Sequence, residues 1–166
     1  MPKSQSAAGS DITDPDSLQS GDGRKLSNFL CFAIYSANLA FGRAYKPILD
    51  ALGLTYTQYI AMVALSEKND HTVGSLGEMM FLESNTLTPI LKKLESIGYV
   101  RRQRDPADER QVRVSLTPAG RSLLATDPAA SLLAATGLGD DFPVVQKSVV
   151  RLRDNLLRAT QGESEK

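Results

Sequence analysis

Apolar residues recur at spacings of three and four from Leu26 onward, and this period predicts a long helix near the start of the chain. Ser27 is the expected N-cap, and Pro47 followed by Gly53 is expected to mark the end. A second helix is predicted after Thr55 or Thr57, and the short amphipathic segment "HTVGSLGEMM" follows it. The apolar stripe of the first helix consists of Leu26, Leu30, Ala33/Ile34, Ala37, Phe41 and Tyr45.

The segment "ESNTLTPILKKLESIGYV" has the clearest helical pattern in the chain. Ser84 is its expected N-cap, Gly98 follows its last turn, and Pro89 removes one backbone hydrogen bond near the first turn. The buried stripe is expected to be Leu87, Ile90/Leu91, Leu94 and Ile97.

The period changes to two between Tyr99 and Thr117, where Val112, Val114 and Leu116 alternate with polar residues. The polar run "RRQRDPADER" precedes this alternation, so the region predicts a β-hairpin with a long charged loop. A further helix is expected to begin at Thr117-Pro118 and to be interrupted at Asp127-Pro128. The last predicted helix runs from Asp141 to about Thr160, with an apolar stripe of Val145, Val149, Leu152 and Leu156.

This order of elements is that of a winged helix-turn-helix, so the predicted fold class is mainly α with a small β-hairpin wing. Residues 1–24 are rich in Ser, Asp, Gly and Pro and are expected to form a disordered tail. Residues 25–166 are expected to form one domain, in which 55–117 is the DNA-binding region. The flanking parts, 25–54 and 118–161, carry more apolar surface than one small core can bury, so they are expected to be dimerisation helices.

Composition restricts the function classes. The formal net charge is zero, which does not indicate a highly charged nucleic-acid or membrane-surface protein, although a local patch remains compatible with it. No apolar run approaches the roughly 20 residues needed to cross a bilayer, and the N-terminus lacks the apolar core of a secretory signal. A lone cysteine without an export signal indicates a reducing cytosol, so a cytoplasmic location is expected. One cysteine and one histidine make a poor metal site; His71 is interpreted as a surface residue, and neither a metal nor a cofactor is expected.

Hydroxyl, amide and lysine side chains on the "SNTLTPILKK" helix suit base edges and phosphates. Alone, this face is better explained as an ordinary solvated surface. The hairpin changes that balance, because it holds five arginines and an arginine on a thin loop can enter a minor groove. Asp108 lies two residues before Arg110 and is expected to orient it. The expected DNA-binding residues are Ser84, Asn85, Thr86, Thr88, Pro89, Lys92, Lys93, Arg104, Asp108, Arg110 and Arg113.

The segment "ESNTLTPILKKLESIGYVRRQRDPADERQVRVSLT" resembles the MarR family of winged-helix repressors. The earlier segment "LCFAIYSANLAFGRAYKPILDALGLTYTQY" resembles the organic hydroperoxide resistance regulator (OhrR) branch of that family, in its one-cysteine form. The similarity extends from about Leu26 to Leu124, while the last helix agrees in pattern only. This resemblance implies a homodimer that binds a pseudo-palindromic DNA operator.

Cys31 is the single cysteine, and a free cysteine in a helix is most often a small buried hydrophobe. Its expected place in the first helical turn favours a thiolate instead, and Tyr35, four residues on, can donate a hydrogen bond to it. Tyr45 lies about 21 Å farther along the helix, out of reach within one chain. The resemblance implies that Tyr45 and Tyr56 reach the cysteine of the partner subunit. Core and interface packing is the plain alternative for these tyrosines, and it is compatible with that role.

The expected function is a repressor, not an enzyme, that leaves DNA when an organic hydroperoxide oxidises Cys31. Since no second cysteine is present, oxidised Cys31 must form a mixed disulfide with a low-molecular-weight thiol, form a sulfenamide, or over-oxidise. One alternative is a broader thiol-based stress regulator or a MarR-type sensor of phenolic ligands. A thiol peroxidase is a further alternative, against which stand the missing resolving cysteine and the absence of a typical peroxidatic loop.

Overall fold

The computed structural model describes residues 25–128 and 130–162. The predicted disordered tail, residues 1–24, lies outside these described residues. The chain divides into two compact units, Met1–Gly42 and Arg43–Lys166. Within the described ranges no single helix has the length and apolar content to cross a membrane, although the bent pair α1 (Leu30–Ala51) and α2 (Tyr56–Glu67) meets that criterion.

The described part of the first unit contains a short 3₁₀ helix, η3 (Leu26–Asn28), which is followed by α1. Ser27 lies inside η3, so the prediction that Ser27 caps the long helix is wrong. The carbonyl of Phe29 accepts the first hydrogen bonds of α1, at 3.0 Å from Phe32 N and 3.1 Å from Ala33 N. Cys31 is therefore the second residue of α1, and its predicted place in the first turn is confirmed.

Helix α1 runs through Pro47 and ends at Ala51, so the prediction that Pro47 begins its termination is wrong. Proline removes only one helical hydrogen bond, and the turn after it is held by the burial of Leu49 and by a Lys46–Asp50 ion pair of 2.6 Å. The chain leaves the helix at Gly53, whose φ of +67° is costly for any residue with a Cβ.

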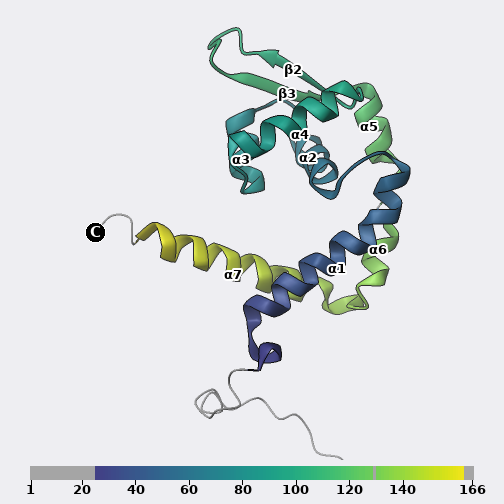
Figure 1. The fold of residues 1–166 in the computed structure, drawn as a ribbon, viewed down its shortest axis with the longest axis vertical. Coiled ribbons are helices and arrows are strands. Elements are labelled where there is room, and N and C mark those ends of the chain that lie inside the picture. Colours follow the sequence, from purple (N-terminus) through teal and green to yellow (C-terminus); the bar gives the residue numbers. More distant parts are fainter. Residues whose placement is uncertain (1–24, 129, 163–166) are drawn as a thin grey trace, which may run out of the picture. The chain divides into compact units, whose positions relative to one another are not determined.

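Helices α2, α3 (Val73–Met80) and α4 (Ser84–Ser96) pack against one another (Figure 1). Thr55 caps α2 in a capping box with Gln58, which decides between the two threonines expected there. The N-cap of α4 is Glu83 rather than Ser84, so the predicted boundary was wrong by one residue. Gly98, with φ of +82°, follows α4 as predicted.

The predicted hairpin is confirmed as β2 (Val100–Arg104) and β3 (Val112–Leu116), paired antiparallel from Val100↔Leu116 to Arg104↔Val112. A two-residue strand, β1 (His71–Thr72), adds to the other edge of β3. His71 pairs with Val114 in this sheet and is only 8% exposed. The interpretation of His71 as a surface residue was wrong. Because β1 pairs with β3, the His71 side chain is buried, and its Nδ1 lies 3.3 Å from Ser75 Oγ of α3.

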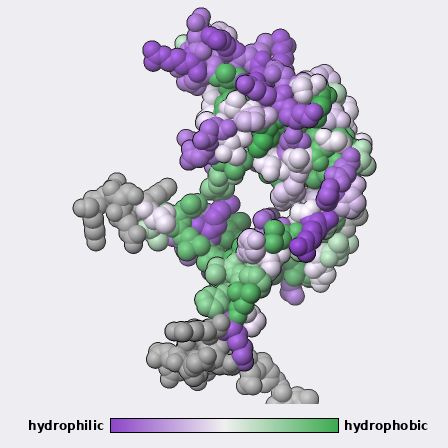
Figure 2. Space-filling model, in the orientation of Figure 1, coloured by the Kyte–Doolittle hydropathy of each residue, from purple (hydrophilic) through white to green (hydrophobic). Residues whose placement is uncertain are grey.

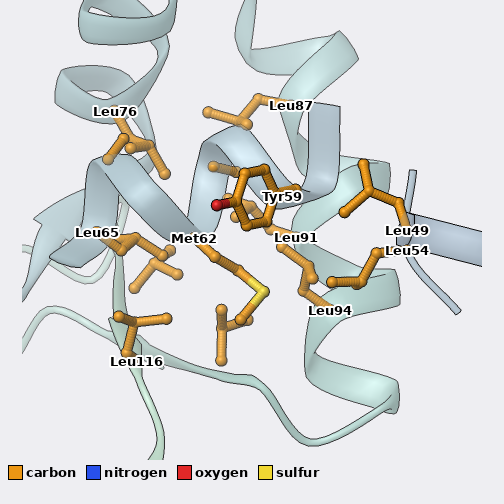
Figure 3. Packing of buried hydrophobic residues seen from close by; sticks show 14 residues of the cluster. Leu49, Leu54, Tyr59, Met62, Leu65, Leu76, Leu87, Leu91, Leu94 and Leu116 are labelled. Carbon is orange, nitrogen blue, oxygen red and sulfur yellow. The ribbon is translucent and has the colours of Figure 1, made fainter. Parts of the chain in front are cut away.

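The core of the second unit lies between α2, α3, α4 and the sheet (Figure 3). Three residues of the predicted α4 stripe, Leu87, Leu91 and Leu94, are fully buried, while Ile90 and Ile97 pack at its margin. The fold is thus mainly helical with a small antiparallel sheet, as predicted. The remaining elements are α5 (Pro118–Ala125), α6 (Ala130–Ala135), η4 (Gly139–Asp141) and α7 (Phe142–Gly162).

Candidate functional site

The apolar stripe of α4 is buried, so the polar side of the helix is exposed to solvent. Ser84, Asn85, Thr86, Pro89, Lys92 and Lys93 are exposed, and Thr88 is half-buried. The Thr88 hydroxyl donates to the Ser84 carbonyl at 2.6 Å, which leaves the Thr88 oxygen free only as an acceptor. No side chain caps the N-terminus of α4 among the described residues, so the positive end of its dipole faces outward. The arrangement suits a phosphate-bearing partner, and contact with DNA remains a prediction for each of these residues.

The five arginines of the hairpin form two groups. Arg102 and Arg113 are held by carboxylates of the same chain, whereas Arg101, Arg104 and Arg110 are exposed. Arg102 donates its backbone N–H to Glu95 Oε1 at 3.1 Å and its Nη1 to Glu95 Oε2 at 3.4 Å, which ties β2 to α4. Hydrophilic side chains cover the outer end of the hairpin, at the top of Figure 2. The exposed arginines are the ones that remain available to an external anion.

Asp108 does not hold Arg110 in the way the sequence suggested. Its carboxylate accepts the backbone N–H of Arg110 at 3.1 Å and the side chain of Gln111 at 3.0 Å. The expectation that Asp108 fixes the guanidinium of Arg110 is therefore corrected: it orders the turn from which Arg110 extends, through the backbone. The reason is local, because an aspartate readily bonds the N–H two residues on in an Asx turn.

Cys31 is a free, exposed cysteine in the first turn of α1. Tyr35 follows it by four residues on the same helix and is also exposed, with its ring 6.5 Å from that of Phe32. The first unit thus places a thiol at a helix start among exposed apolar neighbours, including Phe29 and Leu30. A thiol so placed is accessible to a small oxidant.

Tyr45 and Tyr56, the other predicted thiolate partners, lie together in the second unit. Their ring centroids are 4.9 Å apart, and Tyr59 adds a third ring 5.9 Å from Tyr45. Burial and the neighbouring Tyr45 raise the pKa of Tyr56, and burial is also the main cause that raises the pKa of Tyr59. Both phenols therefore stay protonated at neutral pH and able to donate.

Sequence reasoning missed Tyr59 and the carboxylates that hold the arginines. Tyr59 could have been found, since it lies three residues after Tyr56 and so on the same side of α2. Asp70 had no local signal, because its partner Arg113 is 43 residues away.

Comparisons with known proteins agree with this geometry. The family model "Transcriptional regulator SarA/Rot" matches residues 43–126. The HTH-type transcriptional regulator TtmR of Methylorubrum extorquens is 50% identical over 102 residues, which cover 61% of this chain; the chain spans about half the length of that relative, 52%. The organic hydroperoxide resistance transcriptional regulator of Bacillus subtilis is 39% identical over 138 residues, covering 81% of this chain and 94% of the relative.

Among solved structures, AbfR of Staphylococcus epidermidis is similar in several states. Reduced AbfR bound to DNA has a TM-score of 0.70 and 33% identity, covering 84% of this chain and 99% of AbfR. Over-oxidised AbfR bound to DNA and a disulfide form of AbfR have TM-scores of 0.65 and 0.61. The chain therefore belongs to the SarA/Rot family of transcriptional regulators, which are MarR-like winged-helix proteins, and its similarity to the Bacillus subtilis relative supports the organic hydroperoxide resistance branch.

Proposed function

We propose that this protein is a DNA-binding transcriptional repressor that releases its operator when an organic hydroperoxide oxidises Cys31. The observation that carries the proposal is the single cysteine of the chain, exposed in the first turn of α1. The similarity of this chain covers 94% of the length of a relative whose name refers to organic hydroperoxide resistance. The similar protein AbfR has been solved reduced with DNA, over-oxidised with DNA and in a disulfide form, which supports a redox-responsive DNA-binding protein.

The DNA step uses α4 and the wing, defined as β2, β3 and the loop between them. The hydroxyl and amide side chains of α4 read base edges in a major groove, and Lys92 and Lys93 neutralise phosphates. Arg104 and Arg110, which are exposed, reach the backbone and the adjacent minor groove. Residues 55–117 are the DNA-binding region in this proposal.

A pseudo-palindromic operator requires two such regions about 34 Å apart, so we propose a homodimer. Residues 25–54 and 118–161 would form its interface. Each carries exposed apolar side chains, for example Leu30 (62% exposed) in α1 and Leu156 (59%) in α7. Large exposed apolar surfaces of this kind usually mark an interface. Across the dimer axis, Tyr45 and Tyr56 of one subunit would donate hydrogen bonds to the Cys31 thiolate of the other.

The oxidation step is a two-electron transfer. The Cys31 thiolate attacks the distal oxygen of the hydroperoxide, an S–O bond forms, the O–O bond breaks, and the alkoxide leaves as an alcohol after taking a proton. Cys31 is then a sulfenic acid. The apolar side chains around Cys31 favour an alkyl peroxide over hydrogen peroxide, because burial of an alkyl tail contributes about 25 cal/mol per Å².

The sulfenic acid has no second cysteine within the chain to condense with. A low-molecular-weight thiol can take its place, forming a mixed disulfide and releasing water. This product adds a whole small molecule to the interface, whereas further oxidation adds only oxygen. Since an over-oxidised form of AbfR is found on DNA, we propose that the mixed disulfide is the form of this protein that releases the operator.

The releasing agent can be tested directly. Operator binding is measured by fluorescence anisotropy after addition of cumene hydroperoxide, hydrogen peroxide or salicylate, each with and without a small thiol. The proposal predicts release at the lowest concentration with cumene hydroperoxide plus thiol. Release by salicylate alone would instead support a sensor of phenolic ligands, and equal release by both peroxides a broader thiol-based regulator.

The proposed role is regulatory rather than enzymatic, and a DNA partner supports the expected cytoplasmic location. A thiol peroxidase would consume peroxide continuously in the presence of a reductant. We expect one equivalent of cumene hydroperoxide to be consumed per Cys31, followed by slow turnover set by reduction of the mixed disulfide. Rapid steady-state consumption would contradict a purely regulatory role.

A further inference from the structure

Arg113 was expected from the sequence to contact DNA, yet its guanidinium is occupied within the chain. Its Nε donates to both carboxylate oxygens of Asp70, at 2.9 and 3.0 Å. Its Nη1 donates to Asp105 Oδ2 at 2.9 Å, and its Nη2 lies 2.8 Å from Asp70 Oδ2. Every nitrogen of the guanidinium therefore contacts a carboxylate, and the fork geometry allows two acids to be held at once.

The three residues come from three separate parts of the chain. Asp70 lies directly before β1, in a left-handed conformation with φ of +77°. Arg113 is on the central strand β3, where it pairs with Thr72 of β1 and Gln103 of β2. Asp105 is the first residue of the wing loop, and its other oxygen accepts the N–H of Ala107 at 2.9 Å. The cluster therefore joins the α2–β1 connection to the base of the wing loop.

The charges of this cluster also argue against a DNA contact by Arg113. Two carboxylates surround one guanidinium, so the cluster carries a net charge of −1 and would repel a phosphate. The hydrogen bonds to Arg113 lower the pKa of Asp70, and those from Ala107 and Arg113 lower the pKa of Asp105, so both acids are ionised at neutral pH. The side chain of Asp105 is only 13% exposed and that of Arg113 36%.

We propose that Arg113, with Asp70 and Asp105, is a brace that positions the wing for DNA and does not itself contact DNA. This inference rests on the proposed DNA-binding function. The brace fixes the start of the wing loop. Arg104 directly precedes this loop, and Arg110 lies near its end. On the opposite strand, the contact of Arg102 with Glu95 of α4 holds β2 in a similar way. The wing is thereby held at both strands, and its free arginines reach the groove at a set distance from α4.

Two effects of neutralising Asp70 have opposite signs, which makes the test sharp. Removing a negative charge near DNA should strengthen binding if Asp70 only contributes to the local field. Removing a member of the brace should weaken it. Glu109→Gln is the matched control, since Glu109 is an exposed acid of the wing loop that lies outside the cluster. We expect Asp70→Asn to weaken operator binding by roughly three- to thirtyfold, and Glu109→Gln to leave it unchanged or stronger.

The salt dependence of binding separates a brace from a phosphate contact. Loss of one phosphate contact lowers the slope of log K against log[salt] by about one. We expect Arg113→Lys and Arg113→Gln to weaken binding alike with an unchanged slope, because lysine keeps the charge but cannot hold both acids. Arg104→Ala should lower the slope. The brace is refuted if Asp70→Asn tightens operator binding as Glu109→Gln does. It is also refuted if Arg113→Gln lowers the salt slope while Arg113→Lys keeps the wild-type affinity.

The free protein provides a readout that does not depend on DNA. Hydrogen exchange at the Ala107 and Arg113 amides should accelerate in Asp70→Asn and stay unchanged in Glu109→Gln, with thermal unfolding confirming that both variants fold. Unchanged exchange in Asp70→Asn would overturn the brace. If the wild type failed to bind any operator DNA while its exchange behaved as expected, the DNA-binding proposal would fail and the brace would stand as a feature of the fold alone.

Discussion

Arg110 is the residue of the wing that is proposed to enter the minor groove. Its backbone is fixed by Asp108, while its guanidinium is exposed at the wing. We expect Arg110→Ala to weaken operator binding at least about tenfold, since a lost groove contact by arginine is typically worth about 1–3 kcal/mol. Anisotropy measures the affinity, and thermal unfolding should be unchanged because the side chain is exposed. Unaltered affinity would remove the wing from the mechanism.

Asp70 gives a prediction about pH. Its pKa is lowered in the folded protein by the hydrogen bonds from Arg113, so its ionised form favours the folded state. This contribution is fully present above the ordinary carboxyl pKa near 4 and is lost as the pH falls through the lowered value. The difference in melting temperature between wild type and Asp70→Asn should therefore shrink on acidification below about pH 4. A difference that is equal at pH 7 and at pH 2 would contradict this assignment.

Single residues show where sequence reasoning succeeded and where it could not. Cys31 was placed correctly in a first helical turn, although the wrong residue was chosen as the cap, because the apolar period locates a helix better than its exact start. His71 was misjudged because a polar neighbourhood gave no sign that a two-residue strand would bury it. Arg113 was grouped with the other arginines, since only the fold brings Asp70 to it.

Among the elements, helix α5 closely approaches the backbone of Tyr99, directly before β2, at Gly120. The Thr117 side chain caps this helix as predicted, by accepting from Gly120 N at 3.1 Å. A Cβ added at Gly120 would clash with the carbonyl oxygen of Tyr99, and backbone cannot move aside cheaply. We expect Gly120→Ala to lower the free energy of unfolding by roughly 1–3 kcal/mol.

Urea denaturation measures that effect, and Gly74→Ala in α3 is the matched control. A Cβ at Gly74 would meet only Thr72 Oγ1 at 3.9 Å, an ordinary contact. Alanine also favours a helix over glycine by up to about 1 kcal/mol, so this variant should be as stable as wild type or more stable. Equal destabilisation by both variants would show that the approach of α5 to Tyr99 is not the cause.

At the level of elements, periodicity predicted the helices and the hairpin because each has a stripe or an alternation facing one core. The capping chemistry of Thr55 and Thr117 was visible in the same way. Strand β1 was not predictable, since two residues carry no period. The continuation of α1 beyond Pro47 was also missed, because the burial of Leu49 that sustains it is a tertiary effect.

For the whole molecule, the exposed apolar surface of α1 and α7 predicts an obligate dimer. In the predicted α7 stripe, Val145, Val149 and Leu156 are exposed. Leu152 is half-buried. We expect a dimer by sedimentation at micromolar concentration and dissociation in Val149→Asp, because a buried unpaired carboxylate is costly. A wild-type monomer would contradict both the dimer and the contact of Tyr45 with the partner's Cys31.

The assembly of two subunits does not follow from a single chain. Apolar periodicity on α1 and α7 indicated surplus apolar surface, but neither stripe states which partner covers it. The tyrosine cluster of Tyr45, Tyr56 and Tyr59 is likewise complete as packing within the second unit. Its proposed hydrogen bonds to a thiolate arise only when two subunits meet, so they depend on a measurement in solution.

Release of DNA through oxidation of Cys31 is tested by operator binding of wild type and Cys31→Ser, each before and after stoichiometric cumene hydroperoxide with a small thiol. Serine keeps the size of the side chain but cannot be oxidised to a sulfenic acid or form a disulfide. We expect both reduced proteins to bind alike, the oxidant to release only the wild type, and excess dithiol to restore its binding. Release of Cys31→Ser by the hydroperoxide, or wild type that stays bound after its thiol has been consumed and converted to the mixed disulfide, would contradict this mechanism.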